Sequence, residues 1–193
     1  MSPSTADHPE VDLPEKDRYT YDDYRQLPEG APYELIRGHL AMSPSPSPRH
    51  QIVQANLFFA LSRFVRANQA GRVVSAPIDV QLADTSVVQP DLLYMRRDRL
   101  DHIGEQSIEG APDLVVEILS PATAHRDLTE KKRLYEEHDV REYWVVDPDS
   151  ETVEVFGNTE NGFEQAARIV ERGTVESTVL EGFEIGVADL FSS

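Results

Sequence analysis

A continuous apolar run at residues 114–119, broken only by the carboxylate of Glu117, is the strongest constraint on how this chain can fold. A short run without polar alternation is typical of a central strand that is buried on both faces of a sheet. A carboxylate inside such a strand costs several kcal/mol unless a cation, a proton or an ion-pair partner compensates it. Glu117 is therefore part of a functional site, one half of a structural ion pair, or a residue at a strand end near solvent.

The other hydrophobic patterns predict an α/β domain, of the α+β kind with a mixed sheet and helices on its faces. The clearest helix is expected over residues 48–68, because Val53, Leu57, Leu61 and Phe64 form one apolar stripe behind an N-cap at Ser47. A hairpin is expected at residues 33–42 and a second helix at residues 124–138. Further strands are expected at residues 73–82, 87–95, 114–119, 142–146, 152–156 and 163–170.

Length and composition favour one domain. The 193 residues suit a single domain at 19–193, behind an acidic leader at residues 1–18 that we expect to be disordered because it is rich in Pro, Ser, Asp and Glu. No apolar run approaches the roughly 20 residues of a membrane span, and the first residues lack the basic start and apolar core of a secretory signal. The absence of cysteine excludes thiol catalysis and cysteine-ligated metals, and we expect a cytoplasmic protein.

The net charge of −17 disfavours a non-specific nucleic-acid coat, since phosphate binding needs Lys and Arg. The charge is unevenly distributed. Residues 19–146 hold 19 acids against 14 bases, a net of −5, and contain nearly all the arginines. A locally basic cleft is therefore compatible with the composition.

Several common catalytic motifs are absent from the sequence. It contains no nucleophile elbow, no phosphate-binding loop and no dinucleotide fingerprint, and its six histidines lack metal-ligand spacing. The remaining candidates are acids in apolar segments. Asp91 follows Pro90 inside the run at residues 87–95, where a proline indicates an edge or a bulge, although a turn-initiating Pro-Asp explains the pair equally well. Glu34 lies in the hairpin, and His50, in the first turn of the long helix, is more typical of a capping or packing residue.

The second helix singles out Lys131. At 100° per residue, this lysine lies at the centre of the inner face, whereas Lys132 and Arg133 are free to face solvent. The residues expected beside it on that face are Asp127, Leu128, Leu134 and Tyr135. A buried lysine needs an anion, and Glu117 is the nearest buried carboxylate in sequence, unless Lys131 reaches water past Leu128.

Two or three carboxylates with an inward lysine suit phosphodiester hydrolysis. Two acids can hold Mg²⁺, which prefers oxygen ligands and keeps several waters. Such an ion eases deprotonation of water, and a nearby lysine assists that water or stabilises charge on a phosphate. A carboxylate pair working as glycosidase acid and base is a weaker alternative, because few aromatic residues are present to stack on sugars.

At this point the residues resemble a known family, the PD-(D/E)XK nuclease superfamily, and more closely its Uma-two type of restriction endonuclease. The resemblance covers about residues 19–193, and the order and spacing of its segments make it specific. These segments are Tyr33-Glu-Leu-Ile, His50-Gln51, Val88-Gln-Pro-Asp91, Asp113-Leu-Val-Val-Glu117-Ile-Leu-Ser-Pro121, Asp127 with Lys131 and Tyr135, and Glu142-Tyr-Trp-Val-Val-Asp-Pro148.

The resemblance implies roles for individual residues. Asp91 and Glu117 correspond to the metal-binding acids, with the backbone carbonyl of Ile118 as a further ligand and Glu34 as an upstream acid that contacts the metal, directly or through water. The superfamily lysine stands two residues after the second acid, where this chain has Leu119, and Lys131 matches the position to which the lysine has moved. Arg37 is a second departure, because it stands where the hairpin of the family carries an acid.

The resulting hypothesis is a Mg²⁺-dependent endonuclease acting on DNA, with Mn²⁺ as a substitute ion. Glu34, Asp91, Glu117 and Lys131 would be its catalytic residues. A homodimer is suggested only by analogy with enzymes that cut both strands. The alternative is a catalytically inactive binding module on the same fold, which Leu119 and the acidic charge favour. Basic residues facing DNA would be drawn from Arg49, Arg63, Arg66, Arg96, Arg97 and Arg126.

Overall fold

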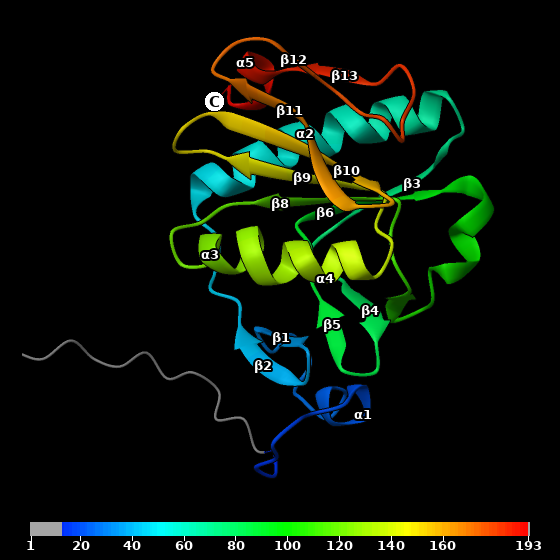
Figure 1. Cartoon of the computed structure of the whole chain (residues 1–193), viewed down its shortest axis with the longest axis vertical. Helices are drawn as coiled ribbons and strands as arrows, with labels where there is room; N and C mark the ends of the chain where they lie inside the picture. Colours follow the sequence, from blue (N-terminus) through cyan, green and yellow to red (C-terminus); the bar gives the residue numbers. More distant parts are fainter. Residues whose placement is uncertain (1–12, 193) are drawn as a thin grey trace, which may run out of the picture.

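The computed structural model describes residues 13–192, and its centre is a mixed six-stranded sheet in the order β11-β10-β9-β8-β6-β3 (Figure 1). Only β8 and β9 run parallel, and the other neighbouring pairs are antiparallel. All five residues of β8 are buried, which confirms the predicted central strand. The six strands are β3 (Gly71–Ser75), β6 (Leu92–Arg96), β8 (Leu114–Ile118), β9 (Glu142–Asp147), β10 (Thr152–Thr159) and β11 (Gly162–Val170).

Helix α2 (Pro48–Ala67) covers one face of this sheet (Figure 1). Its buried stripe of Val53, Leu57, Leu61 and Val65 packs in the same core cluster as Trp144. The hydroxyl of Ser47 accepts a hydrogen bond from the His50 N–H at 3.2 Å, which confirms the predicted N-cap. This cap satisfies a free N–H at the helix start and fixes His50 in the first turn.

The opposite face is covered by the second predicted helix, which is continuous but irregular. It runs through α3 (Ala124–Arg126), a π-helical turn (Asp127–Lys131) and α4 (Lys132–Glu137). Asp127 and Lys131 are buried, as expected, but Leu128 is 41% exposed and the prediction that it faces inward was wrong. The reason is the wider π turn, whose i→i+5 bonding changes the angular spacing that a regular helix would give.

A second, five-stranded sheet lies beyond this helix, in the order β2-β1-β5-β4-β7. The predicted hairpin is confirmed as its strands β1 (Tyr33–Ile36) and β2 (His39–Met42). The other three are β4 (Asp79–Ala83), β5 (Ser86–Val88) and β7 (Ser107–Glu109).

The two strands predicted at 73–82 and 87–95 are each divided between the sheets. The first run forms β3 and β4, and the second forms β5 and β6. Pro77 and Pro90 stand at the two divisions, and because proline has no N–H to donate to a ladder, pairing stops there. Asp91 follows Pro90, so it lies where the chain re-enters the large sheet.

Six short elements were not predicted: α1 (Tyr21–Tyr24), a 3₁₀ turn (Arg97–His102), β7, β12 (Thr174–Glu176), β13 (Glu184–Gly186) and α5 (Val187–Leu190). The last three pack on the face that carries α2 (Figure 1).

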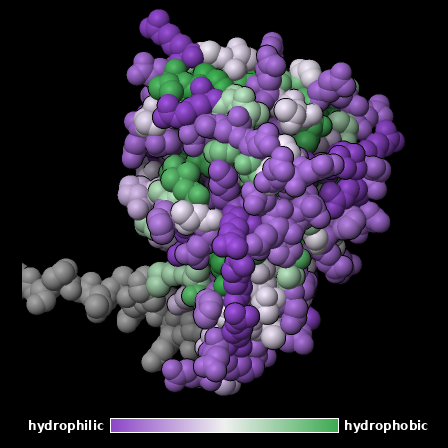
Figure 2. Space-filling view, in the orientation of Figure 1, coloured by the Kyte–Doolittle hydropathy of each residue, from purple (hydrophilic) through white to green (hydrophobic). Residues whose placement is uncertain are grey.

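Polar side chains cover most of the surface seen in Figure 2. Within residues 13–192, no helix has the length and apolar character needed to cross a bilayer. Residues 1–12 of the predicted leader lie outside the described residues. Lys16, in the part of the leader that is described, forms an ion pair with Asp23 at 2.6 Å.

Glu142, at the start of β9, ties the C-terminal segment to the sheet. Its buried carboxylate accepts hydrogen bonds from Trp144 Nε1 at 2.5 Å, from the Thr178 N–H at 2.6 Å and from the Val179 N–H at 3.0 Å, and it also bonds the Thr178 hydroxyl. Four donors therefore enclose the acid, and that of Trp144 is fully buried.

We expect Glu142→Ala to lower the free energy of unfolding by about 3 kcal/mol or more, because four donors, with the buried Trp144 indole among them, lose their acceptor together. The matched change Glu154→Ala removes a partly exposed pair with Arg168 and should cost less than about 1 kcal/mol. Urea unfolding of both variants measures the difference. Equal losses of unfolding free energy in the two variants would show that Glu142 does not hold the C-terminal segment to the sheet.

Candidate active site

Asp91 and Glu117 are brought together by the register of two neighbouring strands. Leu92 lies opposite Val116 in the antiparallel pair β6–β8, so one residue further the register sets Asp91 beside Glu117. Directly opposed residues of an antiparallel pair point to the same face. A hydrogen bond also joins Asp91 to β8 directly, because the backbone N–H of Ile118 donates to Asp91 Oδ2 at 2.7 Å.

Lys131 reaches the same point from the helix. Its Nζ lies 2.6 Å from Glu117 Oε1, 2.9 Å from Glu34 Oε1 and 3.8 Å from Asp127 Oδ1. Burial alone would lower the pKa of Lys131, but Glu117, Glu34 and Asp127 together raise it above its ordinary value. The predicted partnership of Lys131 with Glu117 is confirmed, and the lysine is held as a buried ammonium ion.

Glu117 is buried with more negative charge than positive around it. Burial raises its pKa well above the ordinary value; Lys131 opposes that shift, while Asp127, Asp91 and Glu34 add to it. Glu117 Oε1 also accepts a hydrogen bond from the Tyr135 hydroxyl at 2.5 Å. Within residues 13–192, no hydrogen bond engages Glu117 Oε2, so one oxygen of this carboxylate is available to a ligand.

His50 joins the site, although the sequence pattern favoured a capping or packing role for it. Its Nε2 lies 3.2 Å from Asp91 Oδ2, and Nδ1 is buried with no hydrogen-bond partner in the described chain. Burial lowers the pKa of His50, but Asp91, with smaller contributions from the Ile118 backbone and Asp127, raises it above the ordinary value overall. Gln54, one turn along α2, donates to the backbone carbonyl of Asp91 at 2.9 Å. Two sequence signals pointed to His50: the N-cap at Ser47, which sets its place in the helix, and the His50-Gln51 segment of the family resemblance.

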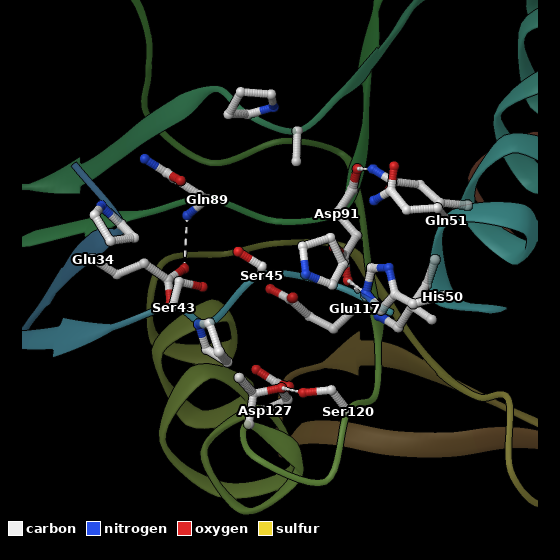
Figure 3. A pocket seen from close by; sticks show the side chains of 18 of the residues that line it. Glu34, Ser43, Ser45, His50, Gln51, Gln89, Asp91, Glu117, Ser120 and Asp127 are labelled. Atoms are coloured by element: carbon white, nitrogen blue, oxygen red, sulfur yellow. Dashed lines mark hydrogen bonds and ion pairs between the residues drawn. The ribbon is translucent and has the colours of Figure 1, made fainter. Parts of the chain in front are cut away.

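These side chains meet in an open pocket of about 460 Å³ (Figure 3). Glu34, Asp91, Glu117 and Asp127 line it together, with His50 beside Asp91. Residues 30–32, 43–46 and 76–77 form its other walls. In the described part of the chain, no three His, Asp or Glu side chains already surround a single point as metal ligands would.

Other sequence candidates lie elsewhere. Arg37 pairs with Glu137 at 2.5 Å on the surface, and Leu119 packs against the core on the side of the second helix. Among the arginines of residues 13–192, Arg126 alone contacts a residue of the site, with its NH1 3.7 Å from Glu34 Oε2. Arg96 ends β6 and Arg97 follows it, roughly 17 Å along the strand from Asp91. The arginines therefore do not converge on the pocket.

A mixed sheet with carboxylates at adjacent strand ends and a buried lysine beside them defines a nuclease-like protein of the restriction endonuclease class. The model of the Uma2 family, described as "Putative restriction endonuclease", matches residues 21–188, and the chain belongs to this family.

A solved structure supports the fold. The crystal structure of "a putative nuclease belonging to DUF820" from Anabaena variabilis ATCC 29413 is similar with a TM-score of 0.76 and 24% sequence identity, over 89% of this chain and 97% of that one. No curated protein matches the chain.

The ion pairs of Lys131 give a test of the site's electrostatics. We expect Lys131→Met to lower the free energy of unfolding by about 3–5 kcal/mol, because buried carboxylates lose their shared cation. The neighbouring change Lys132→Met removes only a cation–π contact with Phe156 and should cost less than about 1 kcal/mol. Chemical denaturation at neutral pH compares the two, and similar small losses would argue against a charged network.

Proposed function

We propose that the protein is a Mg²⁺-dependent endonuclease that hydrolyses phosphodiester bonds in DNA. The observation that carries this proposal is the pairing of Asp91 and Glu117 at one edge of an open pocket, with Lys131 buried behind them. Membership of a family described as restriction endonucleases supports a nuclease, and the ion, the substrate and the roles of the residues are our inference.

The chemistry of the donors suits a hard divalent cation. Four carboxylates line the pocket, against the ammonium of Lys131 and the imidazole of His50, so negative charge is in excess. No hydrogen bond in residues 13–192 uses Asp91 Oδ1 or Glu117 Oε2. Mg²⁺ takes one or two carboxylates and keeps several waters, so it does not need three side chains already in place.

We assign Asp91, Glu117 and the carbonyl of Ile118 to the ion. Bound there, a divalent cation would ease the deprotonation of an attacking water and offset charge on the phosphate. Glu34 and Asp127 hold Lys131 in position. Because its pKa is raised, Lys131 keeps its proton, so it orients water or stabilises phosphate charge as a donor and does not act as a base.

An inactive binding module remains the second candidate. Its support is the close contact of Lys131 with both Glu117 and Glu34, which would also satisfy a purely structural ion pair. Such a module has no need of a divalent cation, so metal dependence separates the two functions.

Calorimetric titration with Mg²⁺ or Mn²⁺ tests the ion site. We expect saturable binding that Asp91→Asn and Glu117→Gln each weaken by at least about tenfold, because each removes a charged oxygen ligand. Glu154→Gln, outside the pocket, should leave the affinity unchanged. No binding at millimolar metal would make the acids structural.

Cleavage of DNA tests the reaction itself. With Mg²⁺ we expect nicking or cutting of DNA that EDTA abolishes and added Mg²⁺ or Mn²⁺ restores. Asp91→Asn should reduce the rate by at least about 100-fold, since the ion supplies a large part of the charge stabilisation. Gel analysis over time measures both, and EDTA-resistant cleavage that persists in Asp91→Asn would contradict the proposal.

A further inference from the structure

The reactive groups of the pocket lie below its walls. The side chains of Glu34, Glu117 and Lys131 are 2%, 4% and 3% exposed, and only Asp91, at 18%, is more open. The walls include four prolines, at positions 32, 44, 46 and 77. A phosphate must therefore enter the pocket to reach Glu117. A duplex is stiff over such distances, whereas an unpaired strand bends freely into a pocket of this size.

The pocket also lacks the charges that a duplex requires. Among the described residues that line it, Lys131 is the only fixed cation, and its ammonium is already shared by acids. Firm duplex binding usually neutralises several phosphates along both strands. The polar wall also includes Gln51, whose Oε1 accepts no hydrogen bond within residues 13–192, whereas the amide groups of Gln54 and Gln89 donate to protein partners. A free amide oxygen can bond to the edge of an unpaired base.

A second cavity of about 400 Å³ borders the first, and Gly30, Ala31 and Gln89 line both. Its wall contains Tyr21 and Arg25, and the Arg25 guanidinium lies over the Tyr21 ring at 5.6 Å from its centre. An aromatic ring beside an arginine is a stacking platform for a base and a cation for its phosphate. The two neighbouring cavities give a strand one place for a phosphate and another for a base.

Resting on the proposed nuclease function, we infer that the site takes an unpaired DNA strand, with the scissile phosphate in the first cavity and a neighbouring base stacked on Tyr21 in the second. Duplex DNA is then a substrate only where it frays, bulges or ends.

The binding arm of the test measures fluorescence anisotropy of a short labelled DNA oligonucleotide, alone and annealed to its complement, with Ca²⁺ in place of Mg²⁺. We expect the single strand to bind at least about tenfold more tightly than the duplex. Tyr21→Ala should weaken single-strand binding about 5- to 100-fold, the usual range for loss of one stacked base. Tyr21→Phe keeps the ring and should bind like the wild type.

Phe59→Ala is the matched control, because Phe59 is an exposed aromatic ring with Arg63 over it at 5.8 Å, outside both cavities. Phe59→Ala should change neither the affinity for the single strand nor the affinity for the duplex. Equal binding of duplex and single strand, or equal effects of Tyr21→Ala and Phe59→Ala, would overturn the inference. Arg25→Ala, on an exposed residue, repeats the test if Tyr21→Ala does not fold, and unchanged single-strand binding in that variant would also overturn it.

The cleavage arm uses the same two DNAs with Mg²⁺. Faster cutting of the single strand supports the inference, and faster cutting of the duplex overturns it while leaving the nuclease function intact. Tight single-strand binding through Tyr21 without any cutting would support a binding site for an unpaired strand and contradict the proposed nuclease function.

Discussion

The buried ammonium of Lys131 is the interaction on which the site depends. It contacts acids from the hairpin of the small sheet, from the central strand of the large sheet and from its own helix. Carboxylates this close repel one another, and a cation between them is what allows all three to be buried. The same contact joins the two sheets and the second helix, so the geometry of the pocket and the packing of the fold share one cause.

Sequence alone could predict the centre of this arrangement because a charge in a buried segment interrupts an otherwise regular pattern. Glu117 breaks an apolar run, and Lys131 breaks the inner face of an amphipathic helix, so their burial and their pairing follow from periodicity. Glu34 and His50 gave weaker signals, because a short hairpin and the first turn of a helix carry polar residues for many reasons. Their places in the site come from tertiary contacts.

The parts that sequence missed depend on properties that hydrophobic periodicity does not encode. A run of strand-like residues does not say which sheet it joins, so the divisions at Pro77 and Pro90 were not foreseen, although Pro90 was seen to weaken its run. The π turn likewise leaves no mark in composition, and it turned Leu128 outward. The hydrogen bond from Tyr135 to Glu117 spans strand and helix, and it follows only from their packing.

Comparison with the other buried acids supports the metal ion that we propose for the pocket. Asp113, just before β8, has Arg96 and Arg99 within 3.3 Å, and Glu142, at the start of β9, is enclosed by hydrogen-bond donors. Both are satisfied by the protein itself. At the other end of β8, Glu117 shares one lysine with Glu34 and Asp127, and Asp91 lies beside it. Among these buried acids of residues 13–192, the group around Glu117 has more carboxylates than partners and lines an open pocket, which supports the cation we propose there.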